Sequence, residues 1–252
     1  MFAPSVPDRE TRADSRGGAR ASAGAYLSAA RLTPLDAAFI GLLALLAGCH
    51  VLAAAFALGW PSAAATDALA MLYLAVLMAR PAWRPLVGRL VVLGLVAGVV
   101  ELATDFAGER VAHSLMYPAT EPLLWGSPYY MPLSWAIVLT QLGYLAWRLR
   151  HLDAPRVPLG LVVALTGLAG AALVPFYEEM AYYARWWHYA PAWRLGHTPV
   201  YVIVFEGAVA AALPLLTRGL LRRPLRSAAA LGLVVGAWMP AAAFVAWFAV
   251  GR

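Results

Sequence analysis

Seven long apolar stretches are the feature of this sequence that most constrains its fold. They cover residues 34–60, 62–79, 86–107, 129–147, 158–184, 198–217 and 225–250. A helix that crosses a bilayer needs about 20 mainly apolar residues, and each stretch comes close to or exceeds that length. The pattern predicts an all-α membrane bundle of about seven transmembrane helices over residues 32–252. Residues 1–31 are rich in Arg, Ser, Ala and Gly without apolar periodicity, which predicts a disordered cytoplasmic tail.

Composition supports a bilayer as the solvent of this chain. Hydrophobic residues make up 62% of its 252 residues and charged residues only 13%. That leaves too little polar surface for an ordinary soluble domain. The only cysteine is Cys49, so neither an intrachain disulfide nor a multi-cysteine metal site is expected.

Basic residues are distributed unevenly between the two sides of the predicted bundle. All 19 are arginines; 15 lie in the tail or in the connections after the second, fourth and sixth stretches, against 4 on the other side. This asymmetry predicts a cytoplasmic N-terminus and an outside C-terminus, in an integral protein of the bacterial inner membrane. The same arginines account for the net charge of +6, and with no recognition motif present a nucleic-acid partner is not expected.

Carboxylates within the predicted spans are the first candidates for a functional site, because acids inside a membrane usually face a cavity or a partner. Glu101, Glu178 and Glu179 lie about six residues before the outward ends of their helices. Asp67 and Glu206 lie six to eight residues after the outward starts of theirs. At about 1.5 Å per residue, all five come to roughly 10 Å beneath one boundary. Asp105 and Glu109 follow Glu101 at four-residue steps, and Glu109 and Glu121 are expected to be solvated loop residues.

Aromatic residues are concentrated on the same side as these acids. The expected pocket residues are Tyr129, Trp135, Tyr182, Trp186, Trp187 and Tyr201, together with Asp67 and His197. An interfacial aromatic belt is the competing interpretation, since Trp and Tyr gather at headgroup level. A belt occurs at both interfaces, however, whereas the cytoplasmic connections hold little more than Trp83 and Trp147. The asymmetry favours a pocket.

Each acid also has a structural interpretation. Asp67 can cap a helix or reach the headgroups, and the deeper glutamates can pair with Arg185 or Arg110 to hold helices together. A metal site that includes His197 is not expected, because the carboxylates and imidazole show no fixed ligand spacing. No cofactor is expected either.

Buried acids beside aromatic rings suit one kind of chemistry in particular. A carboxylic acid in an apolar pocket can act as a general acid near neutral pH, with a neighbouring carboxylate as the base. Protonation of a C=C bond in a lipid-soluble isoprenoid generates a carbocation, and aromatic faces stabilise cations. The predicted acids and bases are Glu101 with Asp105 and Glu178 or Glu179, with Glu206 completing the polar cluster.

A resemblance points to the same chemistry. Glu101, Asp105 and Gly108, followed by Tyr117-Pro118 and the run from Pro128 to Trp135, resemble the carotenoid-hydratase-type membrane proteins, as do Trp187-His188-Tyr189 and Gly196-His197-Thr198-Pro199. Pro175-Phe176-Tyr177-Glu178-Glu179 is similar to the Pro-x-Glu-Glu motif of small membrane lycopene cyclases, with one additional residue. The resemblance implies a carotenoid or other isoprenoid substrate, hydration or cyclisation, and partner enzymes of the same pathway.

Three other functions compete with this hypothesis. A proton-linked or cation-coupled transporter would use the same acids, although no inverted repeat is evident. A non-catalytic assembly factor would pair them with a partner's arginines. A membrane prenyl-protein protease is disfavoured, because Arg185 lies two positions late after the glutamate pair and the last two stretches contain no interior histidine.

Overall fold

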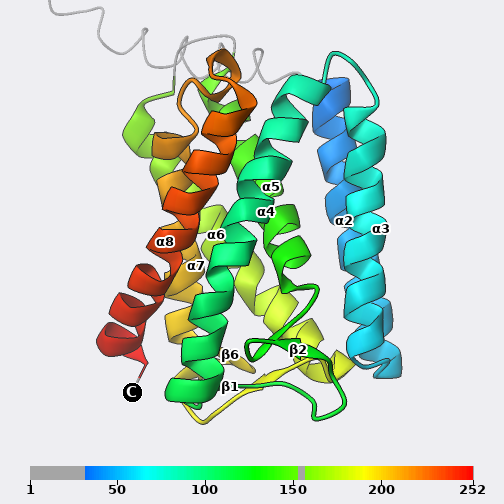
Figure 1. Cartoon of the computed structure of the whole chain (residues 1–252), viewed down its shortest axis with the longest axis vertical. Helices are drawn as coiled ribbons and strands as arrows, with labels where there is room; N and C mark the ends of the chain where they lie inside the picture. Colours follow the sequence, from blue (N-terminus) through cyan, green and yellow to red (C-terminus); the bar gives the residue numbers. More distant parts are fainter. Residues whose placement is uncertain (1–31, 153–156, 252) are drawn as a thin grey trace, which may run out of the picture.

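The protein is a bundle of long helices (Figure 1) in this computed structural model, which describes residues 32–152 and 157–251. The predicted tail over residues 1–31 lies outside the described residues. The helices are α2 (Pro34–Phe56), α3 (Trp60–Met78), α4 (Arg84–Phe106), α5 (Met131–Arg150), α6 (Leu159–Ala184), α7 (Val200–Leu216) and α8 (Leu225–Val250). The predicted helical class is confirmed. Five helices, α2, α3, α4, α6 and α8, are long and apolar enough to cross a membrane, counting only the described residues.

The helices alternate in direction, so the bundle has two distinct ends (Figure 1). One end, at the bottom of Figure 1, carries the C-terminus and the two long connections over residues 112–130 and 185–199. We call it the loop end. The opposite end carries the connections over residues 79–83 and 217–224, which contain Arg80, Arg218, Arg222 and Arg223, and we call it the arginine end.

Short antiparallel strands order the loop end. They are β1 (Leu115–Met116), β2 (Leu123–Leu124), β3 (Ser127–Pro128), β4 (His188–Tyr189), β5 (Arg194–Leu195) and β6 (Thr198–Pro199). β2 pairs with β3 and β5 with β6, each pair within one connection, whereas β1 pairs with β4 across the two. Leu115 lies opposite Tyr189 in that pair, and the amide of Ala190 donates to the carbonyl of Ser114 at 3.0 Å. The two connections therefore form one layer over the loop end.

Glycines allow α4 to pack closely against its neighbours. A Cβ at Gly98 would lie 2.9 Å from the Cα of Pro132 on α5, and one at Gly236 of α8 would lie 2.5 Å from the Cβ of Val100. Such contacts require small residues, as is typical where helices associate without a hydrophobic driving force. They leave α4 between α5 and α8 as the central helix of the bundle.

A polar cluster at the arginine end fixes the start of α2. Thr33 caps the helix, and its backbone and hydroxyl both bond to Asp36 in a capping box. The same carboxylate accepts hydrogen bonds from the hydroxyl of Tyr144 at 2.6 Å and from Nε of Arg148 at 3.0 Å, both on α5. Asp36 thus joins α2 to α5 at the end opposite the predicted acid layer.

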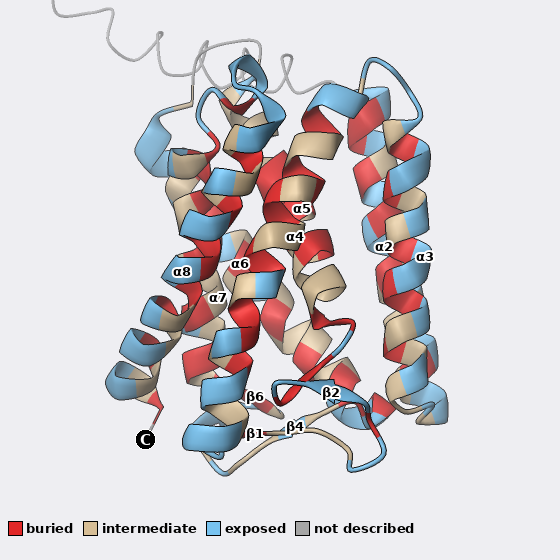
Figure 2. Cartoon of the chain, viewed as in Figure 1, coloured by how far each residue is buried: buried red, intermediate tan, exposed pale blue. Residues whose placement is uncertain are grey.

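The outward face of the bundle is apolar. Figure 2 shows exposed residues along the outer sides of α2, α3 and α8. Many of them are large hydrophobic side chains, such as Ile40, Leu72, Val76, Leu233 and Phe244. Contiguous exposed apolar surface of this kind marks contact with another apolar phase, which agrees with the lengths and hydropathy of the helices.

Glu101, Asp105 and Glu109 follow one another at four-residue steps, but only Glu101 and Asp105 lie on the same side of one α-helix. α4 ends at Phe106 and is followed by the π-helix η1 (Ala107–Val111). A π-helical turn holds more residues than an α-helical turn and so rotates the side chains that follow it. Glu109 consequently forms an ion pair with Arg110 at 2.5 Å and does not line the cavity that Glu101 and Asp105 share.

Candidate functional site

A cavity of about 560 Å³ lies near the loop end of the bundle. All seven described helices contribute to its wall, as do η1 and both loop-end connections. Its volume falls within the range of about 300–1,000 Å³ that is usual for small-molecule pockets. Most of its lining is apolar, with Leu46, Ile137, Val138, Val202 and Phe205 among the contributors.

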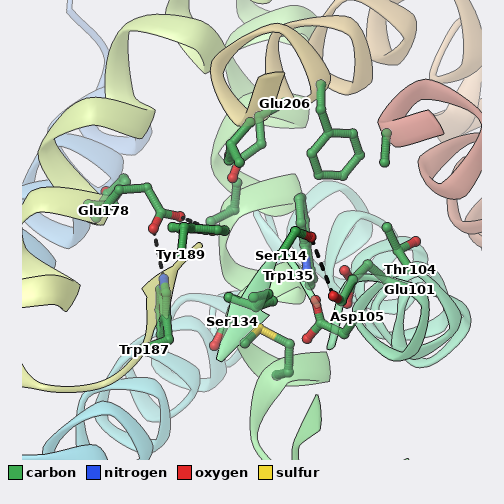
Figure 3. Close-up of a pocket in the computed structure, with 18 of the residues that line it drawn as sticks. Glu101, Thr104, Asp105, Ser114, Ser134, Trp135, Glu178, Trp187, Tyr189 and Glu206 are labelled. Atoms are coloured by element: carbon green, nitrogen blue, oxygen red, sulfur yellow. Dashed lines mark hydrogen bonds between the residues drawn. The ribbon is translucent and has the colours of Figure 1, made fainter. Parts of the chain in front are cut away.

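Five of the predicted site acids line this cavity: Asp67, Glu101, Asp105, Glu178 and Glu206. They come from α3, α4, α6 and α7, and Figure 3 shows Glu101 and Asp105 on one side, Glu178 on the other and Glu206 between them. No arginine lines the cavity within the part of the chain that the structure describes. Carboxylates held together without a cation favour arrangements in which they hold and share protons.

Glu101 and Asp105 form the most buried pair of acids. They lie one turn apart on α4, and Glu101 is only 2% exposed. Asp105 accepts hydrogen bonds from the hydroxyl of Tyr117 at 2.7 Å and from that of Ser127 at 2.5 Å, both in the first loop-end connection. Burial and the neighbouring Asp105 raise the pKa of Tyr117 well above its usual range, so this phenol remains a hydrogen donor.

Two polar atoms of α4 have no partner in this cavity. Oε2 of Glu101 and Oγ1 of Thr104 are both buried without a hydrogen bond from any described residue. Unpaired buried polar atoms are uncommon and costly. Both residues line the cavity, so the two unpaired atoms lie close to the space that a ligand would occupy.

Glu178 is held by the second connection. Its carboxylate accepts hydrogen bonds from Nε1 of Trp187 at 2.7 Å and from the hydroxyl of Tyr189 at 3.1 Å (Figure 3). Burial, with a contribution from Glu178, raises the pKa of Tyr189 well above its usual range. Close packing of α6 on α7, where a Cβ at Gly170 would lie 2.5 Å from that of Ala210, brings Glu178 and Glu206 towards the same space.

Asp67 belongs to a third polar group on the α3 side of the cavity. The hydroxyl of Ser134 on α5 donates to it. Nearby Tyr130, which also lines the cavity, donates to Oε1 of Glu121 at 2.6 Å. The prediction that Glu121 is solvated is wrong, since the loop folds back over the bundle and leaves the residue only 6% exposed. This burial raises the pKa of Glu121 to about 7.

Glu179 lies outside the cavity lining although its neighbour Glu178 is part of it. Consecutive helical residues point about 100° apart. Glu179 accepts a bond from the amide of His197 at 2.9 Å and lies 2.9 Å from Nδ1 of the same residue, whose ring stacks on Tyr182 at 3.6 Å. Glu179, Tyr182 and His197 therefore form a separate cluster that fixes the β5–β6 turn to α6.

Some of the predicted aromatic residues line the cavity, and others lie at the protein surface. Trp135, Trp186, Trp187 and Tyr201 line the cavity. Trp186 is almost fully buried and donates to the carbonyl of Gly59 at 3.0 Å, which ties the second connection to the α2–α3 turn. Tyr129, by contrast, is about half exposed and lies outside the lining. Trp125 and Trp193 are also exposed, as expected of an interfacial belt.

Sequence reasoning missed several residues at the site. His50 is not among the predicted site residues, yet it lines the cavity, and its Nδ1 lies 2.6 Å from the carbonyl oxygen of Leu46. Ser127 and Ser134, which bond to Asp105 and Asp67, carry no sequence signal because their partners lie far away along the chain.

Within the described residues, no group of three or more His, Cys, Asp or Glu side chains could hold a metal ion.

Comparison with protein families gives a match over more than half of the chain. The family called Domain of unknown function (DUF6989) matches residues 102–250, more than half of the chain. The chain belongs to the DUF6989 family. No curated protein and no solved structure matches it. The DUF6989 match includes Asp105, Glu178 and Glu206, and Glu101 stands one residue before it. The description of this family names no function, so the isoprenoid chemistry implied by the resemblance stays a prediction.

Proposed function

We propose that this protein is an integral membrane enzyme that protonates a C=C bond of a lipid-soluble isoprenoid, such as a carotenoid. Seven membrane-spanning helices, with the loop end on the non-cytoplasmic side of a bacterial inner membrane, would place the cavity beneath that surface. The observation that carries the proposal is the buried Glu101, which lines an aromatic-walled cavity beside the anchored Asp105 and whose Oε2 has no hydrogen-bond partner among the described residues. An acid so placed has a proton to give and little water to compete for it.

The proposed reaction begins with proton transfer from a carboxylic acid, Glu101 in the first instance. The O–H bond breaks, the π pair of the alkene forms a new C–H bond, and the products are a carboxylate and a carbocation. Trp135, Trp187 and Tyr201 supply aromatic faces around the cavity, which stabilise positive charge by roughly 0.5–2 kcal/mol each when well placed. The carboxylates add electrostatic stabilisation.

The carbocation can collapse in two ways, and both regenerate a carboxylic acid. In cyclisation, a second C=C bond of the same chain attacks the cation, and a carbon-bound proton then passes to a carboxylate. In hydration, a water molecule adds and passes one of its protons to a carboxylate. Glu178 suits the role of base, since it lines the cavity and the hydrogen bonds from Trp187 and Tyr189 favour its carboxylate form. The proton taken up by Glu178 then has to return to Glu101 before the next turnover.

Expression in a carotenoid-producing bacterium tests this proposal. Extracts of cells with and without the chain are compared by chromatography and mass spectrometry. A new product 18 mass units heavier indicates hydration, and a new isomer indicates cyclisation. Glu101→Gln should abolish either product without loss of membrane-inserted protein. An unchanged profile, combined with proton or cation uptake by reconstituted vesicles, would instead support the rival transporter.

A further inference from the structure

The cavity wall includes side chains that face the outside of the bundle. Ala107 and Val111 of η1 and Phe244 and Phe248 of α8 are exposed and at the same time line the cavity. Val111 is 70% exposed, Phe244 63% and Phe248 54%. A residue that is both lining and exposed stands where a cavity meets the surface. The cavity thus reaches the exterior between η1 and α8.

Helix packing explains why the opening lies there. At the arginine-end half of α8, Gly232 and Gly236 bring the helix against Val96 and Val100 of α4. Pro240 follows within α8 and interrupts its hydrogen-bond ladder. Beyond Pro240 no further glycine of α8 contacts α4 among the described residues, and Ala243 and Trp247 line the cavity.

The α8 side of the opening is one continuous apolar stripe. Pro240, Ala243, Phe244, Trp247 and Phe248 all line the cavity, at the three- and four-residue spacing of one helical face. On the other side stand Ala107, Gly108, Val111 and Ala112. These described residues carry no charge, so the passage has no charged group that would bind an ionic solute, and it suits an apolar chain.

The opening lies close to the buried acids. Glu101 on α4 precedes Gly108 on the adjoining η1 by seven residues, which is about 10 Å along the axis at roughly 1.5 Å per residue. A linear apolar chain inserted between η1 and α8 therefore reaches the carboxylates with its leading end. Its trailing part remains outside, against the exposed phenylalanines.

We propose that the gap between η1 and α8 is a lateral portal through which an isoprenoid chain passes from the bilayer into the cavity, with its trailing end left among the lipid tails. The proposal rests on the proposed function for what happens to the chain inside. It identifies the bilayer, rather than the aqueous phase above the loop end, as the source of the ligand. Phe244, Phe248 and Val111 form the rim.

Photolabelling of the full chain in lipid vesicles tests the portal. The probe is a C20 isoprenoid alcohol with a diazirine at its hydrocarbon end, and labelled peptides are mapped by mass spectrometry. Adducts are expected in residues 107–112 and 240–248. Ala243→Trp fills the passage and should reduce this labelling at least tenfold. Ala241→Trp, at an exposed position two residues away that does not line the cavity, is the matched control and should change it less than twofold.

The outcomes separate the portal from the chemistry. Absence of adducts, adducts concentrated in residues 113–130 or 185–199, or equal labelling of both tryptophan variants would overturn the portal. Labelling does not require turnover, so Glu101→Gln should label like the wild type while forming no product. If the portal residues are labelled but the protein alters no isoprenoid, the portal is supported and the proposed reaction is rejected.

Discussion

Glu178 and Glu179 are neighbours in the sequence, yet their carboxylates serve different parts of the molecule. Glu178 lines the cavity and accepts from Trp187 and Tyr189, whereas Glu179 holds the backbone and ring of His197. The pair therefore offers an internal comparison in which the same chemical change is made at two adjacent positions.

Glu178→Gln should reduce product formation at least 100-fold, because general acid–base catalysis typically contributes factors of about 10² to 10⁴. Glu179→Gln should retain activity within a few-fold, since that residue does not line the cavity. Product yield per amount of membrane-inserted protein is the measurement. Equal loss in both variants would mean that the effect is structural and that Glu178 has no special role.

Removal of the hydrogen bonds to Asp105 should reduce the rate without abolishing it. Tyr117→Phe and Ser127→Ala each remove one hydroxyl donor to this carboxylate. Hydrogen bonds to charged groups contribute about 1.5–3 kcal/mol, so each variant should turn over roughly 10- to 100-fold more slowly. Tyr129→Phe is the control, because Tyr129 does not line the cavity. Full activity of both Asp105 variants would contradict a role for this acid.

Stability should fall as the pH rises from about 4.5 to 7. Burial raises the pKa of Glu121 from 4.5 to about 7, so between these values the folded state binds more protons than the unfolded state, and the free energy of unfolding decreases with pH. The loss contributed by this one group is at most about 3 kcal/mol. Thermal unfolding in detergent followed by tryptophan fluorescence measures it. Glu121→Gln should flatten the pH dependence over this window, and an unchanged slope would refute the assignment.

Two glycine-to-alanine substitutions should change the unfolding temperature differently. At Gly236 a new Cβ would lie 2.5 Å from the Cβ of Val100, whereas at Gly160 it would meet nothing within 4 Å. Overpacking costs typically about 1–3 kcal/mol, so Gly236→Ala should lower the unfolding temperature. Gly160→Ala should leave it unchanged or raise it slightly, as alanine favours helix. Similar unfolding temperatures for the two variants would show that α4 and α8 can separate easily.

Helices were readily predicted from the sequence because their signal is local. The predicted stretches at residues 158–184 and 225–250 differ by at most one residue from α6 and α8. Hydropathy over about 20 residues is sufficient for this, since every backbone group in a spanning helix bonds within the helix. The structure places five predicted acids around one cavity for the same reason: depth follows from position along a helix.

The sequence could not predict which way a side chain points around its helix, or which residues far apart in the chain come into contact. The π-helix after Phe106 turns Glu109 away, and no residue pattern marks such a turn. Glu179 and Glu121 were misplaced because their environment depends on His197 and Tyr130, which reach them only after the connections fold back over the bundle. The rim at Phe244 and Phe248 could be recognised only from the structure, which shows that η1 and α8 line the same cavity.

The β1–β4 pair, although only two residues long on each side, has a consequence for how the site tolerates mutation. Tyr117 and Ser127, which hold Asp105, belong to one connection, and Trp187 and Tyr189, which hold Glu178, belong to the other. Leu115 opposite Tyr189 fastens the two connections together. A change in either connection therefore shifts the donors of both acids, so paired substitutions across the strand pair should be non-additive. The two halves of the site can be expected to change together in evolution, as one inherited unit.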